Sequence, residues 1–153
     1  MEADLDLARE TLGFSAAHFA VIGDRSERLH GHNYRVALRV HGRVDEEGAV
    51  VDFGALKSSL RELCRTLDER MLVATRSARV TVDEHGDSVL LTEGTRRFSL
   101  PRSDVVLLPI LNTTCECLAA HLLAELRARL GHTAYRLALR VEEVPGQGAW
   151  VSE

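Results

Sequence analysis

Three histidines are the residues whose type and spacing best fit a chemical role. Zinc favours imidazole nitrogen, and a catalytic zinc commonly takes three protein ligands and leaves one position open for water or substrate. His30 and His32 flank one glycine, and side chains two residues apart on a strand point to the same face. His18 supplies a third nitrogen if its strand lies alongside. Single histidines are more often surface or hydrogen-bonded core residues, so the third histidine is what favours a metal site.

Two strands joined by a charged loop would bring these histidines together. Residues 5–14 alternate imperfectly between apolar and polar and predict a strand that leads into His18. Residues 30–42 alternate cleanly, and their apolar side chains share a face with His30 and His32. If the two strands are neighbours, the loop of residues 19–29 returns the chain so that His18 lies near the pair.

Two amphipathic helices are predicted to follow. Asp52 is interpreted as the N-cap of the first helix, whose leucines recur at helical spacing. The second helix begins within residues 112–116 and ends before Gly131, a residue that commonly terminates helices. A final strand covers residues 134–144, and a tight turn lets residues 149–151 pair back with it.

The segment between the helices is predicted to be an insertion, from about residue 73 to residue 108. Its pattern indicates a hairpin of strands 79–83 and 88–91, followed by a short strand 96–100. The order of elements predicts one α+β domain over residues 1–153, with two helices on one face of an antiparallel sheet.

Composition limits the classes of function. The chain is 45% hydrophobic and 27% charged, with a net charge of −4, which argues against a nucleic-acid partner because such a protein needs a basic face. No apolar run reaches the length of a membrane span, and the acidic N-terminus lacks the pattern of a signal peptide. A cytoplasmic location without membrane association is therefore expected.

The three cysteines predict no disulfide framework. Their number is odd, and the chain shows no secretory leader. Cys115 and Cys117 are too close together for a zinc-finger pair and are interpreted as small helix residues. Cys115 lies close to a predicted helix start, where the pKa of a thiol can be lowered.

Two stretches around the histidines resemble a known family. Phe14-Ser15-Ala16-Ala17-His18 and Leu29-His30-Gly31-His32-Asn33-Tyr34 are similar to motifs of the 6-pyruvoyl- and 6-carboxy-tetrahydropterin synthases. That family consists of zinc-dependent lyases that act on dihydroneopterin-type substrates. The resemblance implies that the three motif histidines hold Zn²⁺. It also implies the tunnelling fold (T-fold), in which subunits join their sheets edge to edge as a homo-oligomer, usually a hexamer of stacked trimers with sites at subunit contacts.

The same resemblance implies which residues hold a pterin ring. Thr113-Thr114-Cys115-Glu116 is similar to the family's Thr-x-Glu segment, so that Thr114 and Glu116 would bind the ring. The stretch before Pro145 is similar to the strand that ends in the ring-anchoring glutamate. Register favours Glu143, and Glu142 stays an alternative. A carboxylate can accept two N–H bonds from the pyrimidinone edge of a pterin. Thr113 and Glu116 also form a capping-box pattern, which would need no ligand.

The acid–base residues depart from the family pattern. The synthases use a cysteine four positions before the first histidine of the His-Gly-His motif, and here Ser26 stands there. The next residue, Glu27, coincides with the acidic position of a subgroup that cleaves dihydroneopterin to 6-hydroxymethyl-dihydropterin. Glu27 is interpreted as a general base, although it could also be one of several charges on a loop. After the first helix, the family's Leu-Asp-His is replaced by Leu67-Asp68-Glu69, so Asp68 and Glu69 are the candidates for assisting proton transfer.

These residues predict a zinc-dependent lyase that acts on the side chain of 7,8-dihydroneopterin or its triphosphate. The glutamate in place of the cysteine favours retro-aldol cleavage to 6-hydroxymethyl-dihydropterin, in a folate or queuosine type of pathway. A 6-carboxy- or 6-pyruvoyl-tetrahydropterin synthase is the close alternative. A non-catalytic protein that binds zinc and pterin is the alternative from another class.

Overall fold

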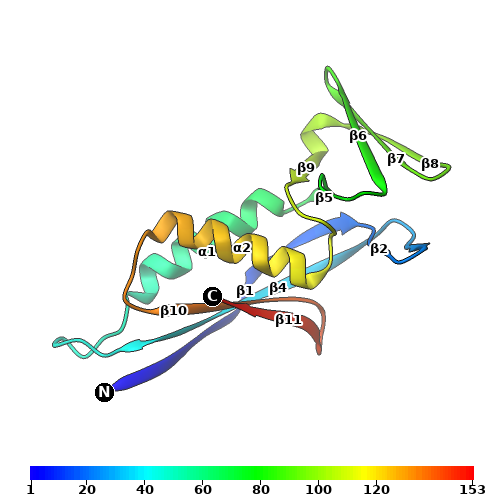
Figure 1. The fold of residues 1–153 in the computed structure, drawn as a ribbon. Helices are drawn as coiled ribbons and strands as arrows, with labels where there is room; N and C mark the ends of the chain where they lie inside the picture. The colour runs from blue at the N-terminus through cyan, green and yellow to red at the C-terminus, as the bar shows by residue number, and fades with distance from the viewer.

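The computed structural model describes residues 1–153 and is built on one curled six-stranded sheet (Figure 1). The strands lie in the order β11-β10-β4-β1-β5-β9. Their bounds are β1 Glu2–His18, β4 His30–Arg43, β5 Arg70–Ala74, β9 Val105–Leu108, β10 Arg136–Val144 and β11 Gln147–Ser152. Neighbouring strands from β11 to β1 are antiparallel, whereas β5 runs parallel to both β1 and β9. The expected α+β class is confirmed, and the parallel strands make the sheet mixed.

Two helices cover one face of the sheet, as expected (Figure 1). They are α1, Phe53–Leu67, and α2, Cys115–Leu130. The side chain of Asp52 accepts a hydrogen bond from the amide of Gly54 (2.6 Å), which confirms it as the N-cap of α1. The apolar faces of both helices and the alternate side chains of β1, β4 and β10 form a core of 26 buried residues. This core fixes which face of β4 points inward, and therefore where its two histidines point.

A three-stranded antiparallel sheet lies at one end of the molecule (Figure 1). Its strands are β6 Val80–His85, β7 Ser88–Glu93 and β8 Arg96–Pro101, and the 3-10 turn Arg102–Asp104 leads from it into β9. Six buried residues join this small sheet to β5, β9 and the end of β1: Phe19, Met71, Val73, Val89, Leu91 and Val105. The hairpin and third strand form as expected. However, β5 and β9, which flank them within residues 70–108, are strands of the main sheet.

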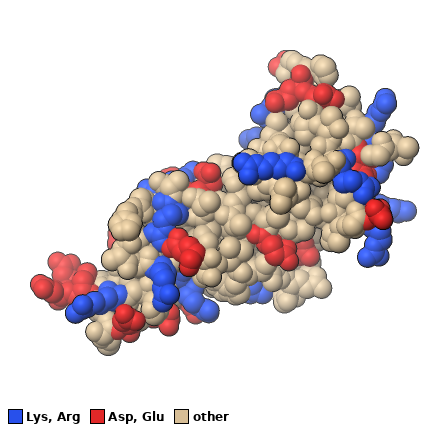
Figure 2. Space-filling view, in the orientation of Figure 1, with Lys and Arg blue, Asp and Glu red and all other residues tan.

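Between β1 and β4, the chain forms the small ribbon of β2, Val21–Ile22, and β3, Arg25–Ser26. This ribbon shapes the 19–29 loop, which projects from the same end of the main sheet as the small sheet (Figure 1). The face in Figure 2 carries acidic and basic side chains interspersed, without a broad basic surface. No helix has the length and apolar character that crossing a membrane requires.

Candidate metal centre

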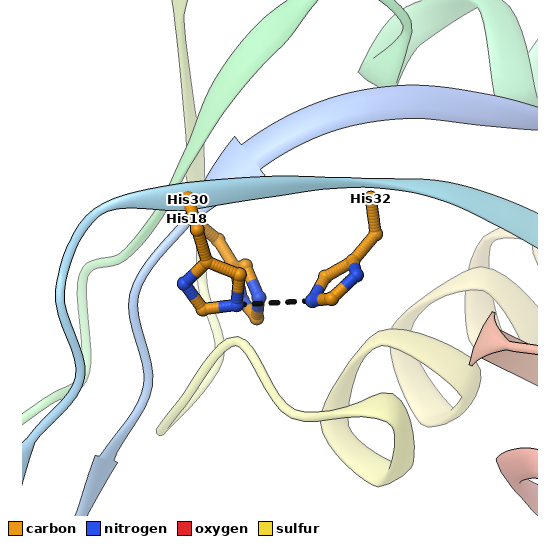
Figure 3. Close-up of side chains that lie close together, drawn as sticks. All are labelled: His18, His30 and His32. Atoms are coloured by element: carbon orange, nitrogen blue, oxygen red, sulfur yellow. Dashed lines mark hydrogen bonds between the residues drawn. The ribbon is translucent and has the colours of Figure 1, made fainter.

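The structure brings the three histidines together at the end of β1 and the start of β4 (Figure 3). His18 pairs across the strands with His30, and Ala16 pairs with His32. Because all three side chains lie on one face, their nearest ring nitrogens fall within 4.8 Å of one another. The i and i+2 spacing therefore directs two imidazoles to the same point, and the neighbouring strand supplies the third.

Backbone carbonyls fix the tautomers of two of these rings. Nδ1 of His18 lies 3.0 Å from the carbonyl oxygen of Thr113, and Nδ1 of His30 lies 2.7 Å from that of Arg28. A carbonyl only accepts, so each Nδ1 donates and each Nε2 keeps its lone pair in the neutral ring. A metal-binding histidine usually donates its other ring N–H to a carbonyl or carboxylate in this way, which holds the ring in place.

The Nε2 atoms converge on a place that suits a cation. Nε2 of His18 is buried and has no hydrogen-bond partner, an arrangement that is costly in a folded protein. Nε2 of His30 lies 3.0 Å from Nε2 of His32. Two nitrogens on a tetrahedral zinc, each at about 2.0–2.1 Å, lie roughly 3.3 Å apart, so this spacing is close to what one ion requires. The residues present therefore fit a metal ion held by three imidazoles.

Burial keeps His18 in the form that a metal needs. Only 2% of the residue is exposed. Burial lowers the pKa of His18 to about 4, and the neighbouring His30 and His32 lower it as well. The ring is consequently neutral near pH 7, and its free lone pair is available to a cation.

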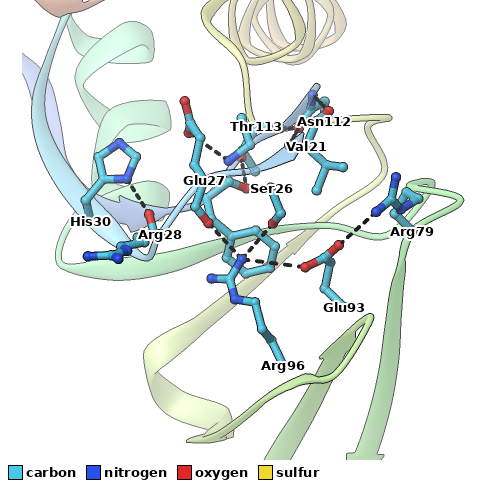
Figure 4. A network of polar contacts seen from close by, with 12 residues as sticks. Val21, Ser26, Glu27, Arg28, His30, Arg79, Glu93, Arg96, Asn112 and Thr113 are labelled. Atoms are coloured by element: carbon cyan, nitrogen blue, oxygen red, sulfur yellow. Dashed lines mark hydrogen bonds and ion pairs between the residues drawn. The ribbon is translucent and has the colours of Figure 1, made fainter. Parts of the chain in front are cut away.

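Glu27 lies beside this centre with its backbone and its carboxylate both engaged (Figure 4). Its Oε2 accepts a hydrogen bond from the amide of Ala20 (3.0 Å), and its own amide donates to the carbonyl of Ala20 (3.0 Å). Its charge also acts on His18, where it favours the protonated ring. Glu27 is therefore held in a defined position next to the histidines, and Oε1 has no protein partner.

A bulge in β10 separates the two neighbouring glutamates. Glu142 pairs with Gly148 and Val144 pairs with Gln147, so Glu143 is the extra residue of the bulged strand. Bulges commonly re-aim a side chain. Oε2 of Glu143 lies 3.9 Å from Nε2 of His32, whereas Oε2 of Glu142 lies 2.6 Å from an Nη of Arg140. The structure therefore places Glu143, and not Glu142, at the histidine cluster.

The start of α2 differs from the capping-box alternative. The N-cap is Thr114, whose side chain faces the amide of Cys117 at 3.5 Å, and not Thr113. The Thr113 hydroxyl donates to the carbonyl of Phe19 (3.0 Å) and lies 3.1 Å from Nδ1 of His18. Glu116 lies exposed in the first turn of α2. The capping-box interpretation of Thr113 with Glu116 was wrong, because the Thr113 hydroxyl is bound to His18 and Phe19 instead.

The helix start, which could lower the pKa of the Cys115 thiol, does not do so here. Burial raises the pKa of Cys115 to about 11, and the nearby charges of Glu143 and Glu116 raise it further. Burial of the thiol and the charges of the two carboxylates therefore raise its pKa by more than the helix start could lower it. At neutral pH the group is a thiol, which is a poor nucleophile.

Asp68 and Glu69 are not brought to the histidines within one chain. Oδ1 of Asp68 accepts from the amide of Ser15 (2.7 Å), and the amide of Glu69 donates to the carbonyl of Ser15 (2.7 Å). No hydrogen bond or ion pair joins either carboxylate to His18, His30 or Glu27. Glu69 has φ 54°, in the left-handed region that non-glycine residues seldom adopt, and both side chains are exposed.

Two supporting residues at the centre were not identified from the sequence. Thr113 holds the His18 ring, and Arg96 of the small sheet donates to the Ser26 hydroxyl (2.6 Å) and the Glu27 carbonyl (2.7 Å). Arg96 lies 69 residues along the chain from Glu27, so no local pattern connects them. For Thr113, its position directly before a helix suggested a different role.

The chain is similar to proteins of one known family. A family model described as 6-pyruvoyl tetrahydropterin synthase matches residues 8–153. A Pyrococcus horikoshii protein named as a 6-carboxy-5,6,7,8-tetrahydropterin synthase is 30% identical over 144 residues, which cover 93% of this chain and 87% of the relative. A Pyrococcus abyssi protein of the same name is 33% identical over 137 residues, which cover 88% and 82%.

A solved relative shares the fold over its whole length. The crystal structure of 6-pyruvoyl tetrahydropterin synthase from Plasmodium vivax superposes with a TM-score of 0.96 at 29% identity, covering 100% of this chain and 98% of that chain. A variant of the same enzyme in which alanine replaces a catalytic glutamate gives a TM-score of 0.95 at 28% identity, with the same coverage. The expected T-fold is confirmed by this match. The chain belongs to the 6-pyruvoyl tetrahydropterin synthase family.

Proposed function

We propose that this protein is a zinc-dependent lyase that acts on the side chain of 7,8-dihydroneopterin or its triphosphate. The observation that carries the proposal is the convergence of three imidazoles, one of them with a buried and unpartnered Nε2, beside a positioned carboxylate. Family membership supports a pterin as the substrate. The preferred reaction is retro-aldol cleavage to 6-hydroxymethyl-dihydropterin.

His18, His30 and His32 would hold the zinc ion. A zinc ion bound by three imidazoles acts as a Lewis acid on the hydroxyls of the substrate side chain and lowers their pKa. The three rings need no rearrangement for this task, because strand pairing and the carbonyls of Thr113 and Arg28 already orient them.

Glu27 would be the general base of the reaction. Its carboxylate removes the proton from a side-chain hydroxyl, the neighbouring carbon–carbon bond breaks, and the carbon left on the ring receives a proton. The product that leaves is an aldehyde, so no oxidant or reductant is needed. A glutamate is a catalytic residue in the Plasmodium vivax relative, which supports a carboxylate in this role.

Glu143 would anchor the pterin ring, with Thr114 and Glu116 assisting. The bulge in β10 directs Glu143 towards His32. If Glu143 holds the pterin ring, the side chain of the substrate would therefore lie at the metal centre. A carboxylate that accepts two parallel N–H bonds fixes both the position and the orientation of a flat ligand. Thr114 and Glu116 lie at the start of α2, one and three residues after Thr113, which contacts His18.

We infer that Asp68 and Glu69 act in the site of a neighbouring copy of the chain. Within one chain these carboxylates are held beside Ser15 and do not contact the histidines. The outer strands β9 and β11 have free edges, which suit pairing between copies in a homo-oligomer. Asp68 and Glu69 would then assist proton transfer across the contact between subunits, and stacked trimers remain the expected assembly.

A 6-carboxy- or 6-pyruvoyl-tetrahydropterin synthase is the second candidate. The names of the Pyrococcus relatives favour the 6-carboxy reaction. In either case Glu27 would take the part of the base, because Ser26 has no neighbouring base and its hydroxyl is held by Arg96.

Product analysis of the zinc-loaded protein separates these reactions. Incubation with 7,8-dihydroneopterin and with its triphosphate is expected to yield 6-hydroxymethyl-dihydropterin. A 6-carboxy or 6-pyruvoyl product would establish the second candidate. The Glu27→Ala variant should lose roughly 100-fold or more in kcat and keep its zinc, whereas Glu47→Ala, in an exposed turn, should match the parent. Absence of turnover on both substrates would leave a protein that only binds zinc and pterin.

A further inference from the structure

We propose that Arg96 of the small sheet, locked by Glu93, is a positioning residue that sets the Glu27 carboxylate at the metal centre. The inference rests on the proposed function, because it assigns a purpose to the base of that reaction. It gives the small sheet of β6, β7 and β8 a part in the chemistry, although none of its residues reaches the histidines.

One nitrogen of Arg96 joins the small sheet to the 19–29 loop (Figure 4). Nη1 donates to the hydroxyl of Ser26 at 2.6 Å and to the carbonyl of Glu27 at 2.7 Å. The rings of Phe19 and Phe98 stack on each other with their centroids 5.3 Å apart, and the central carbon of the guanidinium lies 5.0 Å from each centroid. The guanidinium is therefore held by this aromatic pair and by the hydrogen bonds of its Nη1.

A buried carboxylate locks this arginine. The side chain of Glu93 is 5% exposed, and its Oε2 lies 3.5 Å from Nη1 of Arg96. Its Oε1 accepts from Nη2 of Arg79 at 3.3 Å, and Nη1 of Arg79 donates to the carbonyl of Gly23 at 3.0 Å. The loop is thus held at two points by two arginines that share one carboxylate. A buried charge needs such partners, because leaving it unpaired is strongly unfavourable.

The contacts of Arg96 with the loop fix residues that lie beside the metal centre. Arg96 binds the carbonyl of Glu27, while the amide and the carboxylate of Glu27 both bind Ala20. These three contacts leave the Glu27 carboxylate little freedom. The following residue, Arg28, supplies the carbonyl that orients His30. Loss of the Arg96 contact would therefore displace the base and loosen the support of one imidazole.

The hydrogen-bond partners of Arg96 distinguish a positioning role from one in packing the small sheet alone. Arg96 has two partners in the small sheet, Glu93 and Phe98. Both of its short hydrogen bonds nevertheless go to the 19–29 loop, and an arginine that only stabilised the small sheet would not need them. The side chain of Arg97, the next residue of β8, is exposed and makes no hydrogen bond or ion pair. The two neighbours therefore form a matched pair for substitution on the same strand.

The test compares Arg96→Met with Arg97→Met in the zinc-loaded protein, using hydrogen exchange and steady-state kinetics. The amide of Ala20 is the direct reporter, because it donates to the Glu27 carboxylate. Arg96→Met should speed exchange at the Ala20 and Glu27 amides by about tenfold or more and leave the amides of α1 unchanged. It should lower kcat by roughly 10- to 100-fold with little change in KM, because a base displaced by about 1 Å reacts poorly. Arg97→Met should match the parent in both measurements.

Glu93→Gln is the second variant, since it keeps the shape of the side chain while releasing the arginine. It should speed exchange at the Ala20 amide less than Arg96→Met does, and it decides the question if Arg96→Met does not fold. Exchange within about twofold of the Arg97→Met protein would overturn the proposal, and so would faster exchange at Ala20 with an unchanged kcat. If the parent shows no turnover, the proposed reaction fails, while exchange at Ala20 still shows whether Arg96 holds the carboxylate.

Discussion

At the scale of single residues, the site depends on side chains that hold the histidines in place. Thr113 contributes its carbonyl and its hydroxyl to Nδ1 of His18, and its hydroxyl also donates to Phe19. These contacts fix both the tautomer and the direction of the His18 ring. Supporting partners of this kind commonly change metal affinity when they are replaced.

Thr113→Val should therefore weaken zinc binding without unfolding the protein. The carbonyl remains and the hydroxyl is lost, so we expect a decrease in zinc affinity of roughly tenfold, at the lower end of the usual range. Competition with a chromophoric chelator measures it. Thr95→Val, in an exposed turn of the small sheet, is the control. Equal zinc affinity in the two variants would show that the hydroxyl does not support His18.

The histidine cluster was predictable because two of its members follow from strand geometry alone. His30 and His32 share a face whenever residues 30–42 form a strand. The environment of Cys115 was not predictable in this way, since it depends on Glu143 from β10. A helix start is visible in a sequence, whereas a carboxylate supplied by a distant strand is not.

At the scale of elements, irregular strand pairing sets the direction of the site residues. Ala8 pairs with Ala37 and Gly13 pairs with Arg35, so residues 9–12 of β1 lie opposite the single residue Val36. After this irregularity β1 and β4 pair regularly from Gly13 onward, which places His18 opposite His30. A Cβ atom at Gly13 would lie 2.1 Å from the carbonyl oxygen of Tyr34, which is an overlap with backbone.

Gly13→Ala should destabilise the fold and disturb the metal centre together. The strands must separate to admit the methyl group, and overpacking of this kind costs about 1–3 kcal/mol. Urea unfolding measures the loss. Ala55→Gly, at an exposed position of α1, is a control that weakens a helix by about 1 kcal/mol without touching the strands. If zinc affinity fell no further in Gly13→Ala than in Ala55→Gly, the irregularity would not set the position of His18.

The buried thiol of Cys64 on α1 should lower the free energy of unfolding at high pH. Burial raises the pKa of Cys64 from 9.0 to about 11. Between these two values the unfolded chain releases a proton that the folded chain retains, so the free energy of unfolding falls as the pH rises. Under reducing conditions, the parent should lose about 2 kcal/mol more than Cys64→Ala between pH 8 and pH 11. Equal losses in urea unfolding would contradict a buried, protonated thiol.

The parallel part of the main sheet was the least predictable element. Residues 71–74 and 105–108 are short apolar runs without alternation, and their pairing joins segments more than 30 residues apart. A short apolar run is typical of a buried strand but does not reveal its partner. By contrast, leucines at helical spacing predicted α1 and α2, because a helix depends on local pattern.

At the scale of the whole molecule, the site in one chain lacks the carboxylates expected to assist Glu27. Asp68 and Glu69 lie beside Ser15, away from the histidines. If a second copy supplies them, a mixture of two inactive proteins can rebuild active sites. Joint refolding of Glu27→Ala with the Asp68→Ala, Glu69→Ala double variant should restore a fraction of parental activity. Each protein refolded alone is the control, and a mixture as inactive as its components would place all catalytic groups in one chain.

Removal of metal should leave the fold intact. The core of 26 buried residues lies between the helices and the sheet, and none of the three histidines belongs to it. Zinc is therefore expected to serve the reaction, and not to hold the chain together.

The most direct test is elemental analysis of the purified protein beside His30→Ala and His32→Ala variants. We predict one zinc per chain in the parent, less than a tenth of that in either variant under the same dialysis, and the same circular dichroism in all three. A parent free of zinc after purification in zinc-supplemented medium, or variants that retain the full amount, would contradict a catalytic centre built on these histidines.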